Sequence, residues 1–282
     1  MRKILLAGAA MVFAGVGSAA AADILPAPIY DAPIYEAPVS QPVAAAGGWY
    51  LRGDAGYAWN KIKDPGFFQG SNANYVGFAT SELRSSYSVG VGVGYQIRRY
   101  LRTDLTLDYF SKADFRGSTT GICPGGGACR SSDTSKVGGL SLLANAYVDF
   151  GTFGRFTPYA GAGIGGTYVS WDSLAGTSVS CPGGIPCAPD VTYPGAKSWR
   201  FTYALMAGAS IDVTCNLKAD VGYRYRRISG GKMFGYALGV GPGYEDGMSS
   251  HEVRGGLRYS LGGCPQQEVY IEPAPIMPAV YK

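Results

Sequence analysis

A single histidine, His251, is the side chain of this sequence best suited to general acid–base catalysis near neutral pH. Its neighbours are Ser249, Ser250 and Glu252, and a hydrolase needs a histidine together with a nucleophile or a carboxylate. Residues 250–261, however, alternate between polar and apolar side chains. The alternation predicts a strand with His251 on one face and Glu252 on the other. Because a base and its orienting carboxylate cannot act together from opposite faces, the sequence predicts that the protein is not an enzyme.

Charged side chains share one face of this strand, while apolar side chains occupy the other. This pattern suits a strand whose apolar face meets lipid and whose polar face lines the lumen of a barrel. Other segments repeat it, and the expected lumen charges are Arg52, Asp54, Arg102, Asp104, Asp108, Asp149, Asp212, Lys218, Asp220, Arg224, Arg226, Glu252, Arg254 and Arg258. Because the two signs nearly balance, we expect a lattice of internal salt bridges. A narrow ion path is the alternative, although a wide aqueous channel needs about 16 strands.

Eight segments with a side-chain period of two position these charges. They cover residues 49–59, 87–97, 101–109, 137–150, 156–171, 199–213, 217–226 and 250–261. Each is close to or above the ~10 residues that a tilted strand needs to cross hydrocarbon. Tyr and Trp gather near their ends and predict two aromatic girdles, with Trp49, Tyr57, Trp59, Tyr87, Tyr95, Tyr109, Trp171, Trp199 and Tyr259 as members. Aromatic residues scattered through a core are the alternative interpretation.

The connections between these segments alternate between two kinds. Short ones lie near residues 98–100, 151–155 and 214–216, and long ones near residues 60–86, 111–136, 172–198 and 228–249. Tight turns at one end and long loops at the other are typical of barrels in the outer membrane. The sequence therefore predicts an all-β fold: an eight-stranded antiparallel up-and-down transmembrane β-barrel with short periplasmic turns and four long external loops. A soluble lipocalin-like barrel is the alternative, but it would carry its apolar side chains inside.

The overall composition agrees with a chain of strands. Gly (43) and Tyr (21) are abundant among the 282 residues, and charged residues make up only 16%. The formal net charge is +4, of which Arg2 and Lys3 supply two charges. The remainder is too small and too dispersed to indicate a nucleic-acid partner. Nothing in the sequence predicts a cofactor.

The two ends of the chain differ from the barrel between them. Residues 1–21 have a basic start, an apolar run and small residues before Ala22, which predicts a secretory signal cleaved between Ala21 and Ala22. A membrane-anchoring helix is the alternative, but the apolar run is short. Residues 22–47 and 263–282 are Pro-rich and are expected to be a periplasmic linker and a C-terminal tail. The barrel is expected to occupy residues 48–262.

Six cysteines follow a signal for export to an oxidising compartment, where disulfides are expected. Two pairs in long loops, Cys123–Cys129 and Cys181–Cys187, share the same spacing and the same Cys-Pro-Gly-Gly start. Cys215 and Cys264 lie at the periplasmic ends of neighbouring strands. Six cysteines allow fifteen connectivities, and we expect the three pairs just named. A metal site is the alternative, but the spacing differs from that of zinc ligands and no histidine is near.

The last strand carries the spacing Arg254-x-Gly256-x-x-Tyr259-x-Leu261. It resembles the closing-strand signal that is read by the barrel assembly machinery, which the resemblance implies as a partner. The chain departs from the usual form of this signal because it continues for 21 residues. From signal to closing strand, the sequence resembles the small porin-like outer-membrane barrels of alpha-proteobacteria, which have an OmpA-like eight-stranded domain. Outer-membrane lipid and lipopolysaccharide are then expected partners, and the bacterial outer membrane is the expected location.

Ala22 and Asp23 would begin the mature chain. In the resembled group, some mature proteins begin Ala-Asp and are joined to peptidoglycan through the alanine amine by L,D-transpeptidases. The resemblance therefore implies that Ala22 is an attachment point, with the Pro-rich segment as its spacer. The expected function is a structural barrel that contributes to envelope integrity. A small porin for ions or minor solutes is the alternative.

Overall fold

The computed structural model describes residues 48–70, 74–122, 127–180 and 190–262, all within the compact unit Ala44–Lys282. The expected signal segment 1–21, the linker 22–47 and the tail 263–282 lie outside the described residues. Regular structure within the described ranges consists of strands, and no helix there is long and apolar enough to cross a membrane.

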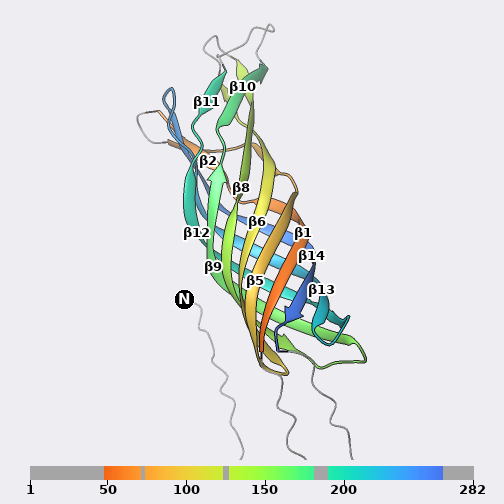
Figure 1. Cartoon of the computed structure of the whole chain (residues 1–282). Coiled ribbons are helices and arrows are strands. Elements are labelled where there is room, and N and C mark those ends of the chain that lie inside the picture. Colours follow the sequence, from red (N-terminus) through yellow and green to blue (C-terminus); the bar gives the residue numbers. More distant parts are fainter. Residues whose placement is uncertain (1–47, 71–73, 123–126, 181–189, 263–282) are drawn as a thin grey trace, which may run out of the picture. The chain divides into compact units, whose positions relative to one another are not determined.

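Eight long strands close into an antiparallel ring (Figure 1). They are β1 (Gly48–Ile62), β5 (Ser86–Arg98), β6 (Leu101–Ser118), β8 (Ala128–Asp149), β9 (Phe156–Trp171), β12 (Lys197–Asp212), β13 (Leu217–Phe234) and β14 (Val240–Ser260). Neighbours along the chain are neighbours in the ring, and the register between β1 and β14 closes it from Tyr50↔Ser260 to Ile62↔Met248. The predicted eight-stranded up-and-down barrel is confirmed. Each expected segment coincides with part of one of these strands, and the segments 137–150, 199–213 and 250–261 extend one residue beyond it.

Three short turns lie at the end of the barrel where β1 begins and β14 ends (Figure 1). The turn between β8 and β9 contains Gly151 (φ +106°) and Gly154 (φ +66°). Both angles lie in the left-handed region, which residues with a Cβ rarely adopt. Short turns mark the periplasmic end of such a barrel, and the opposite end is therefore external.

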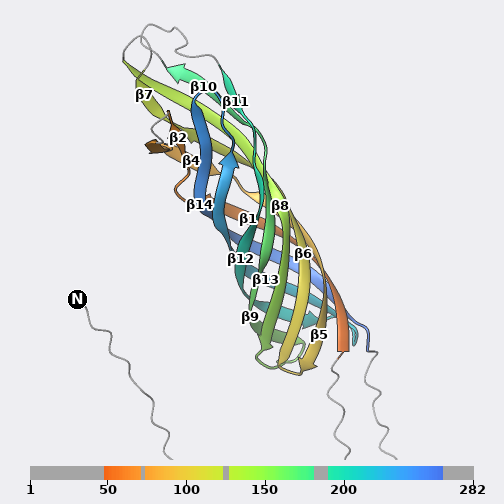
Figure 2. The same ribbon diagram turned by 90° about the vertical axis from the view of Figure 1, so that its left-hand side faces the viewer.

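At the external end, short strands extend the barrel wall (Figure 2). They are β2 (Gly66–Gln69), β3 (Asn74–Gly77), β4 (Thr80–Leu83), β7 (Thr120–Ile122), β10 (Leu174–Ser180) and β11 (Val191–Tyr193). Three of the four long connections predicted for this end therefore contain these short strands. The segment 228–249 is mostly β-hairpin, because β13 and β14 pair from Leu217↔Tyr259 up to Phe234↔Gly243. Its many Gly and Ser residues hid this pairing, since they weaken the side-chain alternation on which the prediction depended.

Candidate functional site

Arg224 lies at the centre of the barrel interior, where strands β13, β14 and β6 bring three charges together. Its Nε and Nη2 donate to Glu252 Oε2 at 2.9 and 2.7 Å, and its Nη1 donates to Asp108 Oδ2 at 2.7 Å. All three side chains are at most 1% exposed. Ser88 Oγ donates to the other oxygen of Glu252 at 2.6 Å. Buried charges with this many partners form a fixed structural unit.

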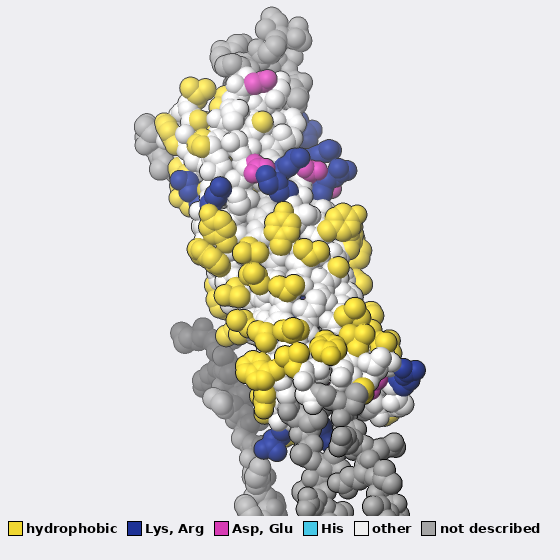
Figure 3. Space-filling view, in the orientation of Figure 1, with side chains coloured by type: hydrophobic (Ala, Val, Ile, Leu, Met, Phe, Trp, Pro, Cys, Tyr) yellow, Lys and Arg dark blue, Asp and Glu magenta, His cyan; other side chains and the backbone are white. Residues whose placement is uncertain are grey.

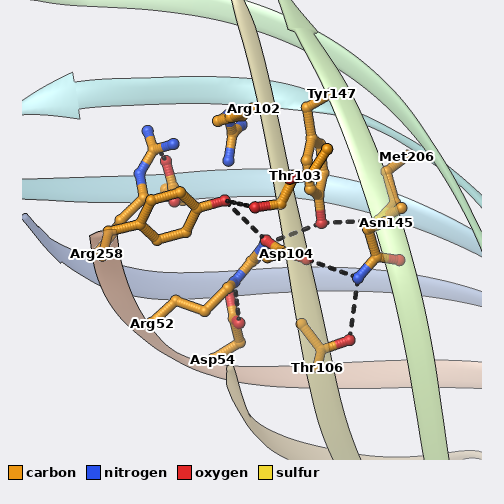
Figure 4. A network of polar contacts seen from close by, with 12 residues as sticks. Arg52, Asp54, Arg102, Thr103, Asp104, Thr106, Asn145, Tyr147, Met206 and Arg258 are labelled. Carbon is orange, nitrogen blue, oxygen red and sulfur yellow. Dashed lines mark hydrogen bonds and ion pairs between the residues drawn. The ribbon is translucent and has the colours of Figure 1, made fainter. Parts of the chain in front are cut away.

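A second cluster surrounds Arg52 (Figure 4). Arg52 forms two 2.8 Å hydrogen bonds with Asp54, and its Nη1 donates to Asp104 at 2.7 Å and to Tyr147 Oη at 2.9 Å. Asn145 Nδ2 donates to the second oxygen of Asp104 at 2.7 Å. These residues come from β1, β6 and β8, so the cluster spans the lumen.

Arg254 joins the two clusters. Its Nη2 lies 3.0 Å from Asp54 Oδ2 and 3.5 Å from Asp108 Oδ1. Its side chain is 7% exposed and projects inward from β14, as the parity of that strand predicted. The ion pairs therefore form one connected network through the middle of the barrel.

Toward the periplasmic end, cations lie against tyrosine rings. Arg102 pairs with Asp149 at 3.1 Å, and its guanidinium lies 4.2 Å from the ring centroid of Tyr147 and 4.6 Å from that of Tyr159. Arg258 lies 3.4 Å from Asp220 and 5.4 Å from the ring of Tyr50. Guanidinium groups stack favourably on aromatic faces. The rings thus fill space that water would need in an open channel.

Three of the expected lumen charges, Arg226, Lys218 and Asp212, differ from the rest. Arg226 is 1% exposed but has no ion pair among the described residues; it contacts Ser141 and Ser250, and its guanidinium lies 4.8 Å from the ring of Phe110. Lys218 is not enclosed, because its side chain is 32% exposed and pairs with half-exposed Asp212 at 2.7 Å. Lys218 and Asp212 adjoin the turn between β12 and β13 and therefore belong to the periplasmic rim rather than to the interior.

An apolar layer closes the interior on the external side of this network, and the sequence analysis did not identify it. Its buried members are Phe67, Leu83, Phe110, Ala113, Phe115, Val137, Val169, Trp171, Leu174, Ile228, Met233, Phe234 and Met248. Phe115 is fully buried, and its ring centroid lies 5.5 Å from Phe78 and 5.7 Å from Trp171. The prediction that Trp171 belongs to an aromatic girdle is wrong, because its side chain is 2% exposed and points inward. The sequence does contain a signal for this apolar layer. It is a reversed alternation, in which apolar residues occupy inward positions such as Ala113, Phe115 and Val137.

The face of the barrel seen in Figure 3 carries a band of hydrophobic side chains. Exposed aromatic residues lie toward its edges, and they include Trp49, Trp59, Tyr87, Tyr95, Tyr109, Trp199 and Tyr259. Lys, Arg, Asp and Glu side chains gather just beyond the external edge of the band (Figure 3). An apolar band with aromatic margins is the lipid-facing surface of a transmembrane barrel.

His251 lies on the outer surface of β14, opposite Trp59 of β1. Its Nδ1 is 2.5 Å from Tyr223 Oη, and its ring lies 5.3 Å from that of Tyr225. Glu252 points into the barrel and pairs with Arg224. Ser250 is buried on the inward side, whereas Ser249 is half-buried. The four residues considered for hydrolysis are therefore not brought together.

The other predicted sites are only partly within the described residues. Cys129 and Cys215 are described and neither is a free thiol. Cys123, Cys181, Cys187 and Cys264 lie outside the described residues, so the three pairings remain predictions. Ala21, Ala22 and Asp23 also lie outside the described residues, so the cleavage site and the attachment point remain predictions. In the closing strand, Tyr259 and Leu261 are exposed on the lipid side, whereas a Cβ at Gly256 would overlap the carboxylate of Asp54.

Comparison with known proteins gives the family. The model of the outer membrane protein beta-barrel domain matches residues 9–260. An uncharacterized protein of Brucella abortus is 40% identical over 255 residues, covering 78% of this chain and 87% of the relative. A Rickettsia bellii protein named as a candidate adhesin is 31% identical, covering 76% of this chain and 88% of its own. The crystal structure of Neisserial surface protein A covers 76% of this chain and 97% of its own, at 20% identity and a TM-score of 0.40. This chain belongs to the outer membrane protein beta-barrel family and is a protein of the bacterial outer membrane.

Proposed function

We propose that the protein is a closed structural barrel that contributes to envelope integrity and does not conduct. One observation carries the proposal: two successive layers fill the lumen, the ion-pair network around Arg224 and Arg52 and the apolar layer around Phe115. An eight-stranded barrel is just wide enough for side chains to fill it. Ions passing through would have to break buried pairs and then cross an apolar barrier that disfavours water. The alternative function, a small porin, requires an open path that these contacts oppose.

Planar-bilayer recording separates the two functions. We expect the refolded barrel to be silent at voltages at which porins conduct, because neither layer leaves a wet path. Conservative changes of interior charge, such as Asp104→Asn, are expected to leave it silent because the apolar layer stays in place. Reproducible openings whose conductance changes with Asp104→Asn or Arg224→Met would favour the porin and overturn the proposal.

A link to the cell wall would extend this structural function. We propose that Ala22, at the start of the mature chain, is joined to peptidoglycan, with residues 22–47 as the spacer. The support is the Ala22-Asp23 start and the Pro-rich composition of the segment. Muramidase digestion of purified walls, followed by mass spectrometry, should release a muropeptide attached to Ala22. Recovery of only free Ala22 amine would remove the tether while leaving the closed barrel in place.

Lipopolysaccharide is the proposed lipid partner at the external edge of the apolar band. Exposed cations there include Lys61, Arg84 and Lys197, for which the described residues provide no ion pair. Phosphate groups of the outer leaflet would supply the missing negative charge. Replacing these three residues by Gln should reduce the lipopolysaccharide that co-purifies with the barrel, and unchanged retention would count against this partner.

A further inference from the structure

A cup of about 160 Å³ opens among the external strands, above the apolar layer. Its wall includes the rings of Phe67, Phe78, Tyr193 and Phe234, whose neighbouring centroids lie 5.3–6.2 Å apart. Exposed Gln69 and Thr177 lie at its margin, so the cup reaches the surface. One carboxylate, that of Asp133 on β8, also lines it.

Asp133 differs from every other buried carboxylate in the described ranges. These carboxylates are Asp104, Asp108, Asp133, Asp149, Asp220, Glu245 and Glu252. Each of the others pairs with a guanidinium, whereas no ion pair is formed by Asp133, which is only 7% exposed. The undescribed stretches between the strands, 71–73, 123–126 and 181–189, contain no Lys, Arg or His to supply a cation. Burying a carboxylate without a cation is costly, and burial accordingly raises the pKa of Asp133.

The orientation of Asp133 is fixed from one side. Ser131 Oγ donates to Asp133 Oδ2 at 2.5 Å, and Ser131 is itself held by the backbone N of Thr119 at 2.9 Å. The other oxygen, Oδ1, faces Gly176 on β10, where an added Cβ would lie 2.9 Å from it and 3.7 Å from the ring of Tyr193. One carboxylate oxygen is therefore held by a hydroxyl, while the second is directed toward the ring-lined space.

We propose that this cup binds a primary ammonium group on a short apolar stem. The carboxylate supplies the counter-charge, and the aromatic rings attract both the cation and its stem. A single available oxygen suits the point charge of an ammonium better than a guanidinium, which is best held by two acceptors. The volume fits one small group, since a cavity of ~150 Å³ accommodates a molecule the size of benzene. A free alkylamine and the side chain of a lysine in another polypeptide share this chemistry.

The test uses the full mature chain refolded in phosphatidylcholine nanodiscs. Pentylammonium, Nα-blocked lysine amide, pentylguanidinium and neutral pentanol are titrated against methyl NMR signals of Leu174, Val191 and Val240, which line the cup. We expect saturable shifts with an ammonium probe, and weaker binding of pentylguanidinium and pentanol. Binding of the lysine probe identifies a polypeptide as the source of the group, and binding of pentylammonium alone identifies a free amine.

Asp133→Asn keeps the shape of the side chain and is expected to weaken ammonium binding at least tenfold. Gly176→Ala keeps the charge but fills the space beside Oδ1, and should weaken binding as well. Asp246→Asn is the matched control, because Asp246 is an exposed acidic residue at the external end that does not line the cup. The affinity of this variant for the ammonium probes should equal that of the wild type. Circular dichroism verifies folding of each variant. Absence of saturable shifts with both ammonium probes, unchanged affinity in Asp133→Asn, or equal affinity for pentanol would overturn the proposal.

Discussion

Replacing Arg224 by Met should lower the free energy of unfolding by about 3–5 kcal/mol, the usual loss when one partner of a buried ion pair is removed. Arg224 is fully buried and neutralises both Asp108 and Glu252. Methionine fills much of the same volume, so the loss would come from two carboxylates left without their shared cation. Urea unfolding of the barrel in lipid bilayers, followed by tryptophan fluorescence, measures the effect.

Lys218→Met is the matched control, because Lys218 lies on the same strand but forms a half-exposed pair with Asp212. Exposed pairs contribute about 0–1 kcal/mol, so a change within that range is expected. Equal losses in Arg224→Met and Lys218→Met would contradict a stabilising interior network.

Replacing Phe115 by Ala is expected to lower the free energy of unfolding by a similar amount, about 3–5 kcal/mol, as found for large buried aromatic residues. Phe115 is fully enclosed between the rings of Phe78 and Trp171 at the centre of the apolar layer. Its removal would leave a cavity that the surrounding β-ladders cannot close by moving. The same unfolding measurement applies.

Phe153→Ala serves as the control for this change, since Phe153 lies in a periplasmic turn and is 70% exposed. Its replacement should change the free energy of unfolding by less than about 0.5 kcal/mol. Bilayer recording adds a second readout. Phe115→Ala alone should remain silent, because the ion-pair network still blocks the lumen below it; conductance in this variant would show that the apolar layer is the sole barrier.

The barrel could be predicted from the sequence because its strands alternate with a strict period of two. The inward orientation of the charged side chains on β1, β6, β13 and β14 could be predicted from side-chain parity alone. The structure confirms it for Arg52, Asp108, Arg224 and Glu252, which are buried inside the barrel. Their pairing could not be predicted, because it depends on the register of strands that are far apart in the chain. Arg224 and Asp108 are 116 residues apart, and no local pattern links them.

The external half was predicted less well for a physical reason. Beyond the membrane the inner face changes from polar to apolar, as at Phe115 and Val137, and the outer face becomes polar. Apolar side chains of the external half, such as Trp171, therefore face the interior although the same pattern nearer the periplasm marks the lipid-facing side. Glu245 pairs with buried Arg200, but it lies in the segment 228–249, for which the sequence pattern predicts a loop and no inward-facing side chain.

The seam between β1 and β14 has a consequence for how the molecule is made. Glu252 and Arg254 come from the last strand, yet their partners include Ser88, Asp54 and Asp108 from the first half of the chain. Until the final strand docks, Asp54 and Asp108 lack Arg254, and Arg224 lacks Glu252, so the network that makes their burial tolerable is incomplete. Nascent chains that stop before β14 would therefore hold an incomplete ion-pair network at an open edge. The strand that completes the wall also completes the ion-pair network inside it, which makes insertion close to an all-or-none event.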